Sequence, residues 1–230
     1  NQTSFERPAL LIIDMVKDNL DERRPVPITP LARRLFDPIN RLTRAFRSAS
    51  WPVAFATDAF SKGDFIFGGK MKPHSLAGTP GAEVAPELDR GPEDLWLPKP
   101  RFSAFFRTGL EQWLKARGVT LCAVAGITTN FCVLTTAMDA LCCVFKTVIL
   151  ADCTTAATES ITGRLHRHRR IGAEAGAHQR DVLLREPIDA HLEFRHLVGT
   201  ERHEEDALDT LRVHPDREEE VDEEGEEEAP

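Results

Sequence analysis

Four short, continuous apolar runs constrain the fold of this chain more than any other feature. They read ALLIIDM (9–15), PVAFATD (52–58), TLCAVAGI (120–127) and KTVILADC (146–153). Strands buried on both faces have such near-continuous apolar sequences, whereas strands with one solvated face alternate polar and apolar residues. The runs therefore predict a parallel sheet with helices packed on both of its faces.

Segments of helical character separate these runs. Apolar residues recur at helical spacing between 30 and 48, namely Leu31, Leu35, Ile39, Leu42 and Phe46. Two further stretches, 103–118 and 130–144, predict helices, and Gly118 is a suitable residue to end the first of them. DLWLPK (94–99) predicts one more strand. The alternation predicts an α/β fold, a three-layer α-β-α arrangement with a mainly parallel central sheet.

Charge divides the chain into two parts. Residues 201–230 hold 15 acidic and 3 basic residues, which leaves 22 acidic and 26 basic residues for 1–200. The acidic segment has little to bury and repels itself, so we expect a disordered tail that aids solubility or binds a basic partner. We therefore predict one domain over 1–200, followed by the tail 201–230.

The composition also excludes several partners. No stretch approaches the roughly 20 apolar residues of a membrane helix, and the N-terminal NQTSFERP is polar. We therefore expect a cytoplasmic protein without a membrane partner. The basic cluster RLHRHRR (164–170) has no interleaved aromatic residues, so we interpret it as a solvated helix face or a contact for the acidic tail, not as a nucleic-acid site.

The five cysteines do not form a disulfide or zinc pattern. They are Cys122, Cys132, Cys142, Cys143 and Cys153, an odd number without paired C-x-x-C spacing. We interpret all except Cys132 as small buried hydrophobic residues.

Three reactive side chains lie near the carboxyl ends of predicted strands, where open parallel sheets bind ligands. Asp14 ends LLIID, Lys99 follows LWLP, and Cys132 opens the helix after AVAGI. The first turn of a helix favours a thiolate, because free N–H groups and the helix dipole point there. The residues alone leave open a buried structural cysteine, a turn-forming aspartate and a solvated lysine.

The segments that carry these side chains resemble the isochorismatase-like cysteine hydrolases. The resemblance rests on LLIIDM, KPRFSAFFRTGLEQWLKARGV, VAGITTNFCVLTTAMDAL and VILADCTTA, and extends over about two-thirds of the chain. The superfamily includes nicotinamidase, N-carbamoylsarcosine amidase and ureidoacrylate amidohydrolase. The resemblance implies the isochorismatase-like hydrolase fold, with Asp14 as general base, Lys99 as catalytic lysine and Cys132 as nucleophile.

The resemblance also implies a particular backbone turn before the nucleophile. It places a cis peptide at Ile127-Thr128, which helps to direct the backbone amides of Thr128 and Cys132 into an oxyanion hole. The implied reaction is hydrolysis of a C–N bond in a small amide, ureido or carbamoyl compound through a thioester. The alternatives are a nicotinamidase, or a binding module on the same fold without turnover. The family further implies a homo-oligomer.

Metal binding is where the sequence departs from nicotinamidases. Those enzymes hold a metal with a D-x-H pair and a later histidine, and the matching residues here are Asp58, Phe60 and His74. Phenylalanine cannot bind a metal, and two protein ligands make a weak site for zinc or iron. We expect no cofactor to be required for the nucleophilic chemistry, with a divalent metal held by Asp58 and His74 as the alternative.

Aromatic residues near the predicted site are candidates for the substrate pocket. Phe102 and Phe105 follow Lys99, and Phe131 precedes Cys132. Each is either a pocket wall or a core residue. The loop 58–85, rich in glycine and proline, is long enough to predict a functional role.

Overall fold

A single parallel sheet forms the centre of the protein. The structure, a computed structural model, describes residues 6–69 and 71–158 and the strand 182–185. The strands are β1 (Pro8–Ile13), β2 (Val53–Asp58), β3 (Leu95–Lys99), β4 (Leu121–Ile127), β5 (Lys146–Thr155) and β6 (Val182–Arg185). Within the described residues they pair in the order β3-β2-β1-β4-β5-β6, and every pairing is parallel. The predicted parallel α/β sheet is confirmed.

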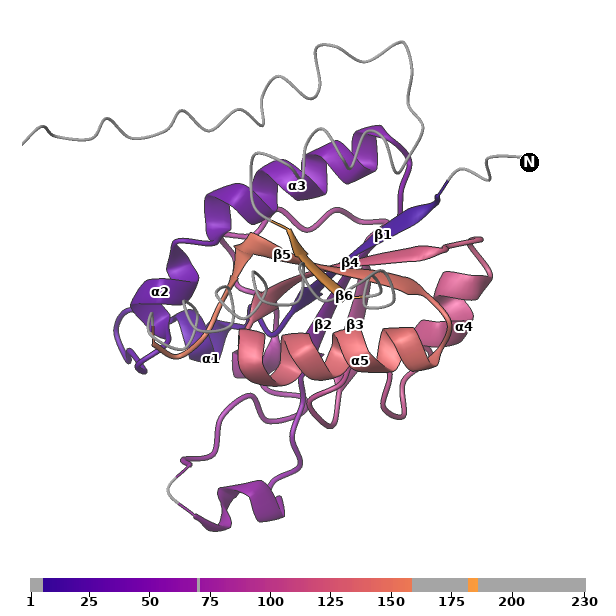
Figure 1. The fold of residues 1–230 in the computed structure, drawn as a ribbon. Helices are drawn as coiled ribbons and strands as arrows, with labels where there is room; N and C mark the ends of the chain where they lie inside the picture. Colours follow the sequence, from indigo (N-terminus) through magenta and orange to yellow (C-terminus); the bar gives the residue numbers. More distant parts are fainter. Residues whose placement is uncertain (1–5, 70, 159–181, 186–230) are drawn as a thin grey trace, which may run out of the picture.

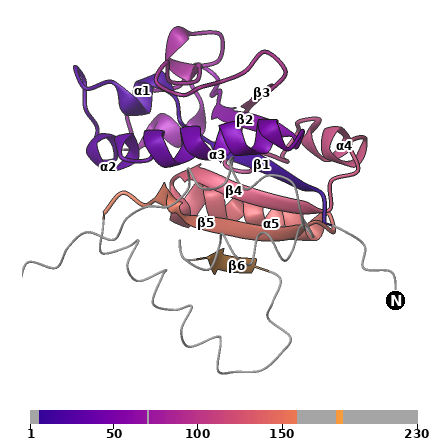
Figure 2. The ribbon, with the colours of Figure 1, turned by 90° about the horizontal axis from the view of Figure 1, so that it is seen from above.

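Helices cover both faces of the sheet, which confirms the three-layer arrangement. The described helices are α1 (Lys17–Leu20), α2 (Thr29–Arg33), α3 (Phe36–Ser48), α4 (Leu110–Lys115) and α5 (Leu134–Cys142). There are also three short helical turns among the described residues: η1 (Phe65–Gly68) and η2 (Pro80–Ala82) lie between β2 and β3, and the π-helical η3 (Thr129–Val133) lies between β4 and α5. Figure 1 shows α3 and α5 on opposite sides of the strands, and Figure 2 shows α3 crossing the sheet.

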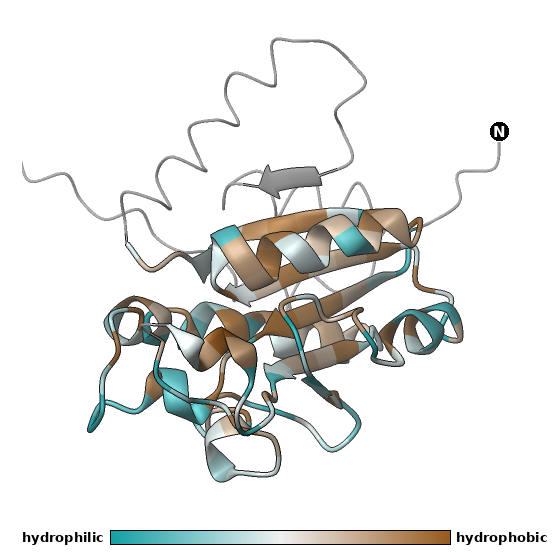
Figure 3. Ribbon diagram, turned by 90° about the horizontal axis from the view of Figure 1, so that it is seen from below, coloured by the Kyte–Doolittle hydropathy of each residue, from teal (hydrophilic) through white to brown (hydrophobic). Residues whose placement is uncertain are grey.

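Alternate residues of β1 build the two cores. Leu10 and Ile12 belong to the cluster that packs under α3, whereas Leu11 and Ile13 belong to the cluster under α4 and α5. All six residues of β1 are buried, because helices lie on both of its faces. The hydropathy colouring in Figure 3 shows the same arrangement, with apolar strands between partly apolar helices. This explains the continuous apolar run from which the sheet was predicted.

Two predicted helices differ from the observed ones. The helix predicted over 30–48 is interrupted between α2 and α3, and the one predicted over 103–118 is reduced to α4. In the second case the hydroxyl of Thr108 donates to the carbonyl of Ala104 at 2.6 Å, and Arg107 has a φ of 52°. Side-chain bonds to the backbone and a left-handed residue favour turns over a helix.

The end of α4 follows the prediction. Gly118 has a φ of +66°, and its N–H donates to the carbonyl of Lys115 at 3.0 Å. Glycine adopts this left-handed conformation at little cost, so it ends the helix.

The interpretation of the four other cysteines as buried is correct for only two of them. Cys122 and Cys153 are buried, but Cys142 is exposed and Cys143 is half-buried. The last two lie where α5 ends and turns toward β5, so their side chains reach the edge of the core instead of its centre.

Some predicted features lie outside the described residues, including the basic cluster 164–170 and the acidic tail 201–230. In the parts of the chain that are described, none of the helices combines the length and the apolarity needed to span a bilayer.

Gly126 is required by the close approach of two central strands. It has a φ of +103°, and a Cβ there would lie 2.1 Å from the carbonyl oxygen and 2.6 Å from the amide nitrogen of Ile13. Ile13 pairs with Gly126 in the sheet and immediately precedes Asp14. A side chain at 126 would therefore displace the backbone that carries Asp14.

We expect Gly126→Ala to lower the free energy of unfolding by more than about 2 kcal/mol, because backbone atoms cannot move aside as a flexible side chain can. Urea denaturation measures this. The matched control is Gly63→Ala, since Gly63 has a similar φ of +84° but its Cβ would meet no described heavy atom within 4 Å. Equal losses in the two variants would contradict the steric explanation.

Candidate active site

Polar side chains mark the carboxyl ends of four neighbouring strands. Lys99 ends β3, Asp58 ends β2, Asp14 follows β1, and Cys132 lies in η3 after β4. These strands are adjacent in the sheet in that order, β3-β2-β1-β4. The three predicted catalytic side chains therefore meet at one edge of the sheet, together with Asp58.

Lys99 is the centre of this cluster. Its Nζ lies 2.9 Å from Oδ2 of Asp14, 2.5 Å from Oδ1 of Asp58 and 3.1 Å from the carbonyl oxygen of Arg101. The lysine side chain is 0% exposed, and the two aspartate side chains are 3% and 8% exposed. The ion pairs are thus almost completely removed from water.

Backbone bonds fix the orientation of Asp14. Its N–H donates to the carbonyl of Ala56 at 2.8 Å, and its Oδ1 accepts the N–H of Asp58 at 2.8 Å. Asp14 also has a left-handed φ of 53°. Both carboxylate oxygens therefore have a partner, and the carboxylate is held in one position at the end of β1.

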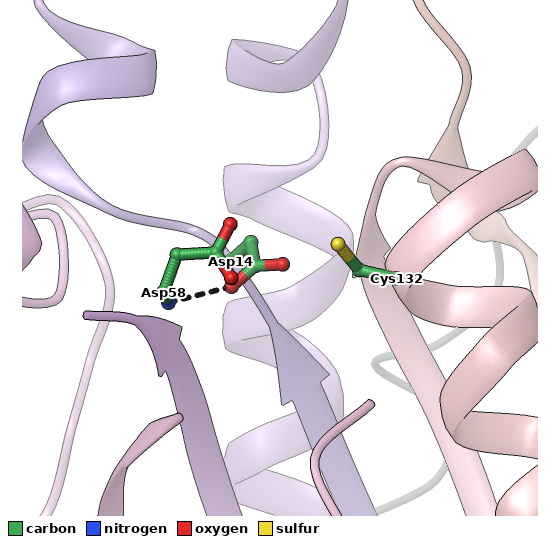
Figure 4. A group of neighbouring side chains, drawn as sticks. All are labelled: Asp14, Asp58 and Cys132. Carbon is green, nitrogen blue, oxygen red and sulfur yellow. Dashed lines mark hydrogen bonds between the residues drawn. The ribbon is translucent and has the colours of Figure 1, made fainter. Parts of the chain in front are cut away.

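Cys132 faces this carboxylate. Its sulfur points toward Asp14 and Asp58 in Figure 4, and the ligand atoms of the three residues all lie within 4.8 Å of one another. The side chain is nearly buried, at 7% exposure. The thiol and the Asp14 carboxylate are therefore close neighbours in a site with little solvent access.

The turn that carries Cys132 is fixed by its own bonds. The Ile127-Thr128 peptide is cis, as the family resemblance implied. The carbonyl of Thr128 accepts the N–H groups of Phe131 and Val133 at 3.0 and 3.3 Å. π-Helical turns of this kind are frequent at functional sites. The assignment of the Thr128 and Cys132 amides to an oxyanion hole stays a prediction.

Sequence reasoning missed a hydroxyl network behind this turn. The Thr129 and Thr154 hydroxyls lie 2.9 Å apart, and that of Thr154 donates to the carbonyl of Gly126 at 2.8 Å. The network joins η3 to β5 and so positions the turn. The sequence signal for this network was Thr154, a polar residue in a mostly apolar run. Its partner on β4 follows only from the pairing of β4 with β5.

The loop between β2 and β3 is joined to the segment that follows Asp14. Oδ2 of Asp18 accepts the N–H of Ser75 at 2.7 Å, and Lys17 forms an ion pair with Glu83 at 2.6 Å. A Cβ on Gly81 would lie 2.2 Å from Oδ2 of Asp18, so the loop packs closely against this carboxylate. The loop and the segment that follows Asp14 are therefore parts of one connected structure.

Burial and charge set the protonation states of the cluster. Burial opposes the Lys99 ammonium, but the charges of Asp14 and Asp58 outweigh it and raise the lysine pKa. Burial and then the charge of Asp14 raise the pKa of Asp58 to about 7, against the opposing effect of Lys99. Lys99 is therefore the permanent positive charge of the site.

The surroundings of Cys132 shift the pKa of its thiol against the thiolate form. Burial first, and then the negative charge of Asp14, raise the pKa of Cys132 well above its usual value, and Lys99 offsets this only in part. Desolvation and nearby carboxylates outweigh the start of the helix. The raised pKa favours the neutral thiol form of Cys132 at neutral pH.

The structure brings together two of the three aromatic pocket candidates. The rings of Phe102 and Phe131 lie 6.3 Å apart, and both are well exposed, at 40% and 57%. Phe105 instead packs 6.2 Å from Phe145, which precedes β5 at the opposite end of the sheet. Phe105 is therefore part of the core under α5.

The candidate metal ligands do not form a suitable site. Asp58 binds Lys99, so a divalent ion near it would be repelled by a buried ammonium. His74 is one of three mutually T-shaped rings, with Phe60 and Phe67 at centroid distances of 5.6 and 5.7 Å. Asp14, Asp58 and Cys132 are close enough to share an ion, but Lys99 already occupies their carboxylates. The residues present do not fit zinc or iron.

Alkylation of Cys132 by iodoacetamide should be slow at pH 7 and should increase about tenfold per pH unit up to pH 9. The thiolate is the reacting form, and an ordinary thiol has a pKa of about 8.5, so a raised pKa removes thiolate at neutral pH. Peptide-resolved mass spectrometry measures the rate at this residue, apart from the exposed Cys142. A rate that levels off below pH 8 would show a lowered pKa and contradict the account.

Comparison with known proteins identifies the family of this chain. The isochorismatase domain model matches residues 8–178. Ureidoacrylate amidohydrolase RutB of Stutzerimonas stutzeri is 32% identical over 136 residues, which cover 50% of this chain and 55% of that protein. A probable inactive nicotinamidase of Arabidopsis thaliana is 37% identical over 102 residues, which cover 43% of this chain and 52% of that protein. The chain spans about half the length of these two relatives.

Solved structures extend the similarity over most of the fold. The crystal structure of nicotinamidase PncA from Bacillus subtilis has a TM-score of 0.64 and 27% identity, and the match covers 78% of this chain and 99% of that one. Together with the domain match, which covers more than half of the sequence, this shows that the chain belongs to the isochorismatase family.

Proposed function

We propose that this protein is a cysteine-dependent hydrolase that cleaves the C–N bond of a small amide, ureido or carbamoyl compound. The observation that carries the proposal is a buried cluster in which a thiol lies close to a carboxylate, and in which a lysine binds the same carboxylate. Cys132 and Asp14 have their reactive atoms within 4.8 Å, and Lys99 lies 2.9 Å from Asp14. This is the set of nucleophile, base and fixed charge that covalent catalysis needs.

The first half of the reaction forms a thioester. Asp14 accepts the thiol proton of Cys132, and the sulfur attacks the carbonyl carbon of the substrate. The carbonyl π electrons move to the oxygen, which the backbone amides of Thr128 and Cys132 stabilise; one such donor typically contributes about 3 kcal/mol. The tetrahedral intermediate then collapses, the C–N bond breaks, and protonated Asp14 gives its proton to the departing nitrogen.

The second half of the reaction hydrolyses the thioester and regenerates the free thiol of Cys132. Asp14 accepts a proton from water, and the oxygen of that water attacks the thioester carbon. The C–S bond then breaks and the Asp14 proton returns to sulfur. A resting thiol suits this scheme, because the thiol proton is the one that the leaving ammonia or amine receives.

Relatives support a C–N bond as the target. One similar protein is named a ureidoacrylate amidohydrolase, and one similar structure is that of a nicotinamidase. Nicotinamide is the second candidate substrate, because the exposed rings of Phe102 and Phe131 can stack on a planar ring. Another relative is named as a probable inactive nicotinamidase, so a binding module without turnover is the competing interpretation.

The test is ammonia release from a panel of small primary amides and carbamoyl compounds that includes nicotinamide. We expect one compound to be hydrolysed, with a loss of at least about a thousandfold in Cys132→Ala, because the nucleophile is removed. The matched control is Cys122→Ala, since Cys122 is also buried and lies on β4 away from the cluster. Full activity in Cys132→Ala would exclude the mechanism, and no turnover with any compound would favour the binding module.

Chelation should leave this activity unchanged. The carboxylates of Asp14 and Asp58 are bound by Lys99, and His74 packs among aromatic rings, so no catalytic step depends on a metal. The measurement is the initial rate after dialysis against EDTA, followed by addition of zinc or iron. A lost rate that the metal restores would contradict the expectation.

A further inference from the structure

The Lys99 ammonium has a partner for each of its protons. An ammonium has three N–H donors, and its Nζ has three acceptors within hydrogen-bond distance, in Asp14, Asp58 and the carbonyl of Arg101. In this arrangement Lys99 has no donor left for a substrate. It acts on the reaction through Asp14, whose carboxylate it holds beside Cys132.

Asp58 contacts both Lys99 and Asp14. Its carboxylate accepts from Lys99 at 2.5 Å, and its backbone N–H donates to Asp14 at 2.8 Å. The contact follows from the sheet, because Asp58 of β2 and Lys99 of β3 are direct neighbours in the register. Asp58 is also almost fully buried, so water cannot replace it as an acceptor.

We propose that Asp58 is a positioning residue that holds the Lys99 ammonium against Asp14, and that it is not a metal ligand in this protein. The catalytic consequence of this inference rests on the proposed function, whereas the contact between Asp58 and Lys99 does not. Without the Asp58 carboxylate, Lys99 keeps one charged partner. One of its buried N–H groups then has no acceptor in its present position. The ammonium then moves, and Asp14 keeps the backbone N–H of residue 58 as the only fixed partner of its carboxylate among the described bonds.

The surroundings of Asp58 agree with this role. The nearby ring cluster of Phe60, Phe67 and His74 gives the loop an apolar interior. Arg101, whose carbonyl completes the set of acceptors, binds Asp64 at 2.8 Å and lies over the ring of Phe65. The loop after β2 is therefore bound to the segment after β3, and Lys99 lies where these two segments begin.

The catalytic test compares Asp58→Asn with Asp58→Ala. Asparagine keeps an acceptor and loses the charge, whereas alanine loses both. With the substrate found in the panel, we expect kcat to fall about 10- to 100-fold in Asp58→Asn, the range typical of partners that orient a reacting group, and further in Asp58→Ala. KM should stay within about twofold, because Asp58 does not touch the substrate.

Asp94→Asn is the matched control. Asp94 is 8% exposed and is bound by Arg47 at 2.6 Å, but it precedes β3, at the opposite end of that strand from Lys99. Its loss should lower stability and leave kcat unchanged. An unchanged kcat in Asp58→Ala would overturn the proposal, and so would wild-type protein that contains stoichiometric zinc or iron which Asp58→Asn lacks.

A stability cycle tests the contact even if the protein has no turnover. Asp58→Asn should lower Tm in the wild type, because it leaves the buried Lys99 ammonium with one charged partner fewer. In Lys99→Met it should raise Tm or leave it unchanged, because two carboxylates then face each other without a cation. Equal Tm shifts in both backgrounds would overturn the proposal. Opposite Tm shifts in a protein that shows no turnover would support the contact between Asp58 and Lys99 and would contradict the proposed function.

Discussion

A lysine ammonium without solvent contact, held between two carboxylates, is the interaction on which this site depends. Lys99, Asp58 and Asp14 come from the ends of three adjacent strands, so the sheet itself brings them together. Removal of one partner from a buried ion pair typically costs about 3–5 kcal/mol, because the remaining charge has no water to stabilise it. The cluster therefore requires that the three strands keep their register.

The same charges explain the state of the nucleophile. One ammonium balances one of the two carboxylates, so a thiolate on Cys132 would add a further negative charge to a buried site. These charges therefore favour the neutral thiol. Asp14 is held by Lys99 and by the backbone of Asp58 in a position to receive this proton. In the proposed mechanism, the same interactions that order the buried site also place the general base beside the thiol.

Much of this arrangement could be predicted from the sequence, because the relevant signals are local. Continuous apolar runs predicted the strands, and the rule that ligands bind at their carboxyl ends brought Asp14, Lys99 and Cys132 together. The bond between Asp58 and Lys99 could not be predicted, since it depends on the register of β2 against β3. The sequence indicated that the helix start favours a thiolate on Cys132, but burial, which a sequence does not give directly, outweighs that effect and raises the pKa of the thiol. The shortened helix before Gly118 depends on the conformation of Arg107 and the hydroxyl of Thr108.

The covalent intermediate is the most direct test of the account. A compound that releases ammonia would be mixed with the enzyme and quenched in acid within one turnover, and the peptides would be analysed by mass spectrometry. The account predicts a mass increase equal to the acyl or carbamoyl part of the substrate on the peptide that contains Cys132. Turnover with no adduct on Cys132, or with the adduct on another residue, would contradict it.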